Sequence, residues 1–136
     1  MQTKFHVAIA AVLLLGPGLA LAGDSKVTLT GKDEVPAVQT SATGAGMITV
    51  GADKSVTGSV TTKGIDGIAA HIHQAAVGKN GPPIISLEKG ADGAWNVPKG
   101  SKLTDEQVAA YKAGELYVNV HSAANKNGEI RGQLKP

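Results

Sequence analysis

The sequence predicts an all-β domain, either a sandwich or a barrel, with one short helix. Beyond residue 22, most of the chain consists of short segments in which apolar and polar residues alternate, as expected for strands with one buried face. Turn-forming residues recur about every eight to twelve positions, and the 18 glycines fit many tight turns. The chain has no cysteine, so the domain must fold without disulfides.

The alternation places strands at residues 27–30, 47–50, 55–62, 67–74, 84–87, near Trp95, 115–122 and 129–134. In the first strand, Val27 and Leu29 alternate with threonines. The polar, proline-marked stretch 31–40 then predicts a loop. The Gly-Ala-Asp-Lys stretch at 51–54 predicts a hairpin between the second and third strands, and Asn-Lys-Asn-Gly at 125–128 predicts the turn that joins the last two.

One segment departs from the β pattern. Thr104 is followed three residues later by Gln107, which is the spacing of a capping box. Gly114 stands where a helix would end. We therefore expect a short helix over residues 105–113.

The first 22 residues are typical of a secretory signal peptide. Lys4 gives the positive start, residues 7–15 are apolar, and residues 20–22 form a small-residue cleavage site. The apolar run is shorter than the roughly 20 residues that a membrane span needs. We therefore expect a mature domain of residues 23–136, without a membrane span, that is periplasmic or secreted.

The charge balance argues against nucleic-acid partners. The sequence holds 13 basic and 11 acidic residues, without a run of either sign. Nucleic-acid binding domains instead carry a clear basic patch.

The histidines are the candidate functional residues. His6 lies in the leader, which leaves His71, His73 and His121 in the mature chain. Side chains alternate along a strand, so His71 and His73 share one face with α-carbons about 7 Å apart. The same alternation puts His121 on the polar face of its strand. We expect all three on the polar side of the sheet, outside the apolar core.

Other polar residues have weaker claims. Arg131 shares an outward face with Glu129 and Gln133, and the simplest prediction is a cross-strand Arg–Glu pair on a solvated surface, although Glu129 is also a candidate to orient a histidine. We expect Met47 in the core rather than as an axial ligand. Asn119 lies on the face of His121, and Glu34 is expected to shape a loop.

Four separated segments resemble a bacterial CHRD domain, the module named from chordin. They are GKDEVPAV, AAHIHQAAVGKNGP, LTDEQVAAYKAGELYVNVHS and NGEIRGQL, and they occur in the expected order between about residues 27 and 134. The resemblance implies an immunoglobulin-like or Greek-key β-sandwich. It also implies a possible role as a metal-free protein-interaction module.

A second resemblance concerns the histidines. An H-x-H strand followed far downstream by a strand that ends in one histidine is similar to the copper-site layout of Cu/Zn superoxide dismutase. That layout matches His71 and His73 to the pair and His121 to the late ligand. The loop that supplies the zinc ligands in those enzymes has no histidine here, and the disulfide is missing. A zinc partner site is therefore not expected.

Three imidazoles suit copper or zinc, and the Irving–Williams order favours copper, with zinc as the second choice. The sequence therefore predicts a periplasmic or secreted copper carrier or store that uses His71, His73 and His121. Two alternatives stay open: a copper-only oxidoreductase acting on superoxide, in which Arg131 would steer the anion, and the metal-free interaction module. The expected partners are a metal ion and, as a further candidate, another exported protein.

Overall fold

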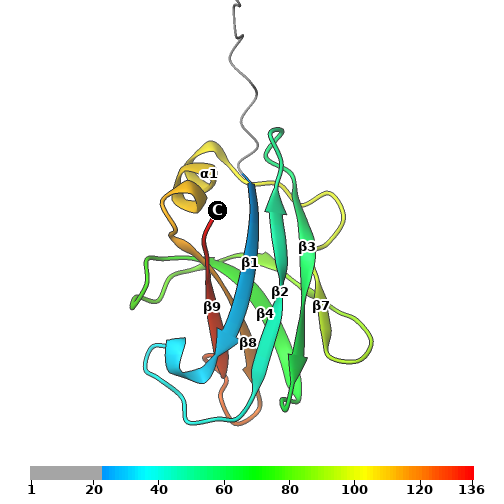
Figure 1. Cartoon of the computed structure of the whole chain (residues 1–136), viewed down its shortest axis with the longest axis vertical. Helices are drawn as coiled ribbons and strands as arrows, with labels where there is room; N and C mark the ends of the chain where they lie inside the picture. The colour runs from blue at the N-terminus through cyan, green and yellow to red at the C-terminus, as the bar shows by residue number, and fades with distance from the viewer. Residues whose placement is uncertain (1–22) are drawn as a thin grey trace, which may run out of the picture.

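A computed structural model describes residues 23–136, which form one curled antiparallel sheet with a single α-helix (Figure 1). The strands are β1 (Gly23–Thr30), β2 (Thr43–Val50), β3 (Val56–Lys63), β4 (Gly67–Gln74), β5 (Pro83–Ser86), β6 (Glu88–Lys89), β7 (Ala94–Asn96), β8 (Leu116–Ser122) and β9 (Ile130–Leu134). The helices are the 3-10 turn η1 (Gly31–Asp33) and α1 (Asp105–Lys112). The expected signal peptide, residues 1–22, lies outside the described part of the chain.

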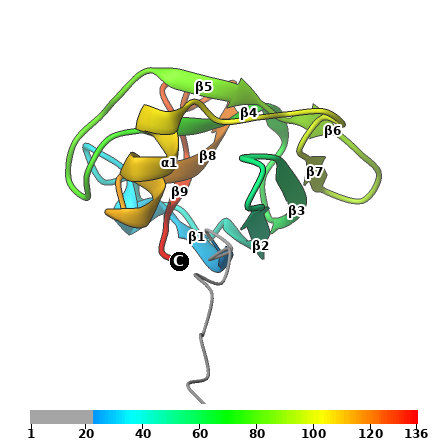
Figure 2. The same ribbon diagram turned by 90° about the horizontal axis from the view of Figure 1, so that it is seen from above.

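The sheet nearly closes on itself. Its strand order is β5-β4-β8-β9-β1-β2-β3-β7-β6. The two end strands, β5 and β6, are separated in sequence by Leu87 alone, whose amide donates to the Ala70 carbonyl of β4 at 2.9 Å. Figure 2 shows the resulting curl from above. The predicted all-β fold with one short helix is confirmed, in its barrel form.

Alternation along the strands fills the inside of the barrel with apolar side chains. The fully buried ones include Leu29 of β1, Ile48 of β2, Val60 of β3, Val118 of β8 and Ile130 of β9. They come from strands that are neighbours in the sheet, so removal of their surface from water drives the closure.

No helix in this part of the chain is long and apolar enough to cross a bilayer.

Strand β2 begins at Thr43, four residues before the expected start at residue 47. Gly44 and Gly46 carry no side chain, so they hide the alternation. At Gly46 a β-carbon would lie 2.1 Å from the Ser59 carbonyl oxygen, so the close approach of β3 requires a glycine there.

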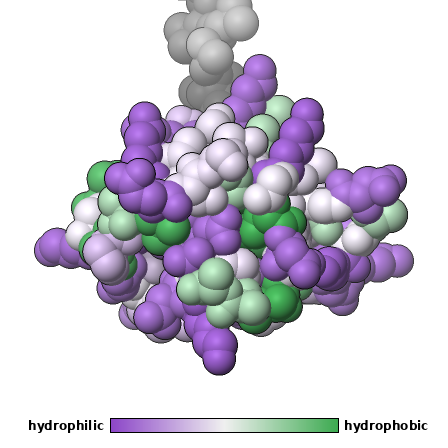
Figure 3. All heavy atoms as spheres, turned by 90° about the horizontal axis from the view of Figure 1, so that it is seen from below, coloured by the Kyte–Doolittle hydropathy of each residue, from purple (hydrophilic) through white to green (hydrophobic). Residues whose placement is uncertain are grey.

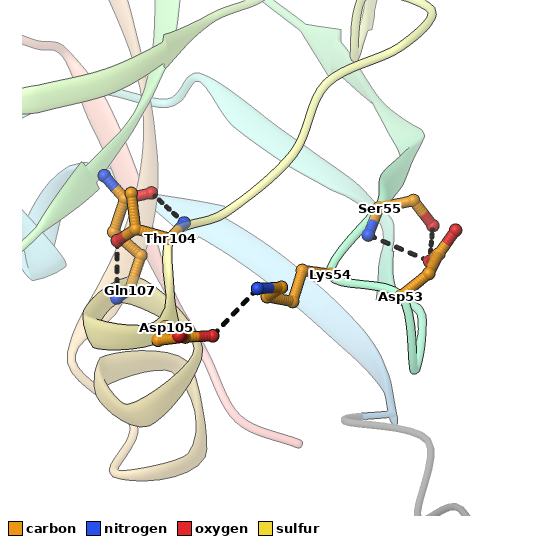
Figure 4. A network of polar contacts seen from close by, with 6 residues as sticks. All are labelled: Asp53, Lys54, Ser55, Thr104, Asp105 and Gln107. Atoms are coloured by element: carbon orange, nitrogen blue, oxygen red, sulfur yellow. Dashed lines mark hydrogen bonds and ion pairs between the residues drawn. The ribbon is translucent and has the colours of Figure 1, made fainter.

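The expected helix and its cap are confirmed at α1. The Thr104 hydroxyl accepts from the Gln107 amide at 3.2 Å, and the Gln107 side chain accepts from the Thr104 amide at 2.9 Å (Figure 4). This capping box satisfies donors that a helix start leaves free. Lys54, in the β2–β3 turn, pairs with Asp105 at 2.9 Å and links the helix start to that hairpin.

The outward face of β8 and β9 departs from expectation. Arg131 and Glu129 were expected on a solvated surface, yet they are only 1% and 9% exposed, and they do not pair with each other. Loops cover this face: Arg131 donates to the Ala76 carbonyl at 3.2 Å, and Thr40 donates to Glu129 at 2.8 Å. Alternation in one strand cannot reveal such a cover, because the loops come from elsewhere in the chain.

The expectation for Met47 is also wrong. Its side chain is 39% exposed on the outer face of the sheet, because Ile48 takes the inward position.

At the end of the barrel away from α1, hydrophobic residues form only small groups separated by polar ones (Figure 3).

Candidate metal centre

Two neighbouring strands bring the three histidines together. His71 and His73 stand on the outward face of β4. Strand β8 pairs with β4 in antiparallel register, with Ala69 opposite His121 and His71 opposite Asn119, so His121 lies diagonally across from His71 on the same face. One ring nitrogen from each histidine lies within 4.8 Å of the others. In residues 23–136 no other group of three histidine, cysteine or acidic side chains converges in this way.

The spacing suits a small metal ion. Nδ1 of His71 lies 3.0 Å from Nε2 of His121, and the His73 ring centroid lies 5.5 Å and 6.1 Å from those of His71 and His121. Neighbouring ligands at about 2.0–2.1 Å from one ion lie about 3 to 4 Å apart. A small rotation of the side chains would therefore bring all three nitrogens into range.

Backbone carbonyls fix which nitrogens are free. Nδ1 of His73 lies 2.9 Å from the Gly81 carbonyl oxygen, and Nδ1 of His121 lies 2.8 Å from that of Lys126. A carbonyl only accepts, so each of these Nδ1 atoms carries the proton and each Nε2 keeps its lone pair. In the metal-free protein the lone pair of His121 Nε2 accepts from Nδ1 of His71 at 3.0 Å. This is the arrangement in which metal-binding histidines are commonly held.

His73 presents the clearest sign of a missing partner. The residue is 8% exposed, and its buried Nε2 makes no hydrogen bond of good geometry, although the Asn119 side chain is close enough to raise the pKa of His73. A buried polar atom without a partner is costly, and native structures usually supply water, an ion or a donor. The residues therefore fit a metal ion at this point.

Burial favours the neutral form of the His71 and His73 rings. It lowers the pKa of His71, and the neighbouring His121 and His73 lower it further. Burial also lowers the pKa of His73, against the opposing effect of the Gly81 carbonyl. A lowered pKa leaves the imidazole unprotonated at neutral pH, which is the form that binds metals.

A stack of side chains supports His73 from behind. Its ring lies parallel to that of Tyr117, with centroids 4.8 Å apart and an interplanar angle of 5°. From β9, on the other side of β8, the Arg131 guanidinium carbon lies 3.5 Å from the Tyr117 ring centroid. The sequence did not single out Tyr117, although its place two residues before Asn119 on the histidine face was a usable signal.

Gly81, in the loop after β4, contacts both Tyr117 and His73. Its amide donates to the Tyr117 hydroxyl at 3.2 Å, while its carbonyl accepts from His73. A β-carbon at Gly81 would lie 1.8 Å from the Gln74 carbonyl oxygen, so the loop can take this path only with a glycine.

Glu129 does not hydrogen-bond a histidine, contrary to one expectation. It accepts from Ser122 at 2.7 Å, Thr40 at 2.8 Å and Asn125 at 3.2 Å. The Ser122 bond is the main reason that the pKa of Glu129 is lowered. The carboxylate thus anchors the loop that carries Lys126, and it acts on His121 only through that loop.

Asn119 and Glu34 are both buried, and the Asn119 side chain is close enough to His73 to affect its pKa. The Asn119 amide donates weakly to the Asn127 carbonyl at 3.4 Å, and its Oδ1 has no partner. Glu34 was expected to shape a loop, but its carboxyl is 6% exposed and one of its oxygens is also without a partner.

A family model described as the CHRD domain matches residues 25–134. The chain belongs to the CHRD family. No curated protein and no solved structure matches it. The three histidines of this CHRD domain lie within the matched region, on strands that pair directly.

Proposed function

We propose that this CHRD protein binds one copper ion through His71, His73 and His121 and serves as an exported copper carrier or store. The observation that supports this most is that one ring nitrogen from each of the three histidines lies within 4.8 Å of the others, while Nε2 of His73 is buried.

The ligand chemistry favours copper over zinc. Three neutral imidazoles form a nitrogen set for which divalent copper ranks highest among first-row ions. A three-histidine site also suits zinc, which is the second choice. When bound, the ion would supply Lewis acidity and, for copper, one-electron chemistry.

A carrier or store is favoured over the superoxide-converting alternative. His71 and His121 are only partly buried, so the site opens to solvent on their side and an ion can enter or leave. The alternative of a copper oxidoreductase that acts on superoxide requires Arg131 to attract the anion to the metal. Arg131 is 1% exposed and is separated from His73 by the Tyr117 ring, so it does not face the site.

Export is part of the proposal and is supported by the sequence of residues 1–22 alone. A protein outside the cytosol meets copper beyond cytosolic thiol buffering. Another exported protein is then the natural candidate to deliver or receive the ion.

The direct test is calorimetric titration of the metal-free protein with Cu(II), and with Cu(I) under reducing conditions. We expect one equivalent to bind and the His73→Ala variant to lose most of the affinity. Ser86→Ala is the matched control, because Ser86 pairs with His71 on β5 but offers no imidazole. Equal affinity in wild type and His73→Ala would remove the metal proposal.

Two further measurements separate the alternatives. A superoxide assay on the copper-loaded protein should give a rate no better than that of free copper, and a clearly higher rate would favour the enzyme. If neither wild type nor variant binds metal but only the variant loses a protein partner, the interaction module is correct.

A further inference from the structure

Arg131 is a buried cation that makes no direct ion pair within the described residues, although Glu34 is near enough for the two to interact electrostatically. Arg131 is 1% exposed, and within residues 23–136 no carboxylate oxygen lies within 4.0 Å of its guanidinium. Its hydrogen bonds go to neutral acceptors at 3.2 to 3.4 Å, namely the Ala76 carbonyl, the Gln133 side chain and the Asn80 side chain. Buried charges are normally paired, because desolvation without a partner is costly.

Arg131 also lines a hollow of about 400 Å³, and none of the three histidines lines it. Arg131 and Glu34 are its buried lining residues, whereas Lys32 and Lys135 are exposed and stand at its rim. Thr28 and Gln133 add a hydroxyl and an amide. The volume is within the range of small-molecule sites.

The charges around the hollow favour an anion. Three cationic side chains line it, against the acidic side chains of Asp33 and Glu34. Asp33 already accepts a hydrogen bond from the Thr30 hydroxyl at 2.8 Å. Burial raises the pKa of Glu34 to about 7, more than Asn119 and Arg131 lower it, so this carboxyl is largely uncharged below neutral pH.

We propose that this hollow is a binding site for a small oxyanion, a carboxylate or a phosphate, which pairs with Arg131 and is flanked by Lys32 and Lys135. Three of the five guanidinium N–H groups donate to Asn80, Ala76 and Gln133, which leaves Nε–H and one N–H of Nη1 to donate to such oxygens. The site is distinct from the metal centre, since the Tyr117 ring separates the two. A failure of copper binding therefore does not affect it.

The test is calorimetric titration of the metal-free protein at low ionic strength, with inorganic phosphate in one arm and succinate in the other. We expect saturable binding of at least one probe. The Lys32→Ala/Lys135→Ala variant should bind about fivefold more weakly, since each exposed charge contributes a fraction of a kcal/mol. Lys63→Ala/Lys99→Ala is the matched control, since it removes the same charge from exposed positions that do not line the hollow.

Two single variants sharpen the result. In titrations above the pKa of Glu34, Glu34→Gln removes a negative charge that lines the hollow and should strengthen binding, while Arg131→Gln should abolish it. If Arg131→Gln does not fold, the rim variant and Glu34→Gln still decide. The proposal is overturned by the absence of saturable binding with both probes, by equal weakening in the two double-lysine variants, or by weaker binding in Glu34→Gln.

Discussion

The ring of His73 is fixed by contacts that do not depend on any metal. Tyr117 stacks on it at 4.8 Å and the Gly81 carbonyl holds its Nδ1 at 2.9 Å. Both contacts hold the ring in one orientation, in which one of its nitrogens lies within 4.8 Å of a ring nitrogen of His71 and of His121. Residues of this kind set metal affinity because they hold a ligand in its binding orientation before the ion arrives.

This gives a prediction for Tyr117. Tyr117→Leu removes the stacked ring, so we expect copper affinity to fall by about tenfold, the lower end of the range for residues that orient ligands. Tyr117→Phe is the control, because it keeps the ring and loses only the hydroxyl that accepts from Gly81. Calorimetric titration of both variants checks this, and equal affinities in the two would show that stacking does not position His73.

The raised pKa of Glu34 predicts an unusual pH dependence of the free energy of unfolding. Burial raises its pKa from the ordinary value of 4.5 to about 7. Between these values the folded protein keeps a proton that the unfolded chain releases, so this group lowers the free energy of unfolding as pH rises from about 4.5 to 7. Glu34→Gln removes the effect, and the variant should gain up to about 3 kcal/mol relative to wild type across this range.

Urea unfolding of both proteins at pH 5 and pH 7.5 measures the difference. His71 and His73 have lowered pKa values and act with the opposite sign below pH 6.5, but they are present in both proteins and cancel in the comparison. Parallel pH profiles for wild type and Glu34→Gln would contradict the prediction.

Among the elements, α1 depends on its first turn. The helix has eight residues, which is too short to be stable alone in water. Its capping box and the buried Tyr111, whose hydroxyl donates to the Gly23 carbonyl at 2.9 Å, tie it to the barrel. Thr104→Ala should cost about 1 kcal/mol of unfolding free energy.

Chemical denaturation checks this value, with Lys102→Ala as a control at an exposed position two residues earlier. A loss in the control as large as in Thr104→Ala would show that the cap bonds contribute nothing specific. Copper binding should be unchanged in both, since α1 supplies no residue to the histidine cluster.

The pairing of β4 with β8 is the element-level feature on which the metal centre depends. These strands are separated by more than forty residues, yet they pair along their whole length. The hairpin β2–β3, in contrast, is a local pairing through a short turn. Local pairings can be read from turn residues, whereas the β4–β8 pairing follows only from closure of the sheet.

For the whole molecule, one core serves all strands. Ile48 is fully buried and Met47, its neighbour in β2, is 39% exposed. Ile48→Ala should therefore cost about 2–5 kcal/mol, through lost burial and the cavity left behind. Met47→Ala should stay within about 0.5 kcal/mol of wild type. Thermal or urea unfolding compares the two, and similar losses would mean that the assignment of faces in β2 is wrong.

The sequence by itself determined most of the elements, and the faces of β4 and β8, although it missed the start of β2 and the outward position of Met47. Alternation in β4 and β8, the capping spacing of Thr104 and Gln107, and the Gly-rich turns all act over a few residues, so their consequences can be read locally. The set of three histidines and their common face were predicted in the same way, and the structure places the three side chains together.

Tertiary structure decided what covers that face. Arg131 and Glu129 were expected in solvent and are buried, because the loops around Thr40 and Ala76 fold over β8 and β9. The hollow beside Arg131 and the raised pKa of Glu34 follow from the same cover. Burial depends on segments far apart in the chain, and a pattern of period two carries no information about which segment will lie on top of it.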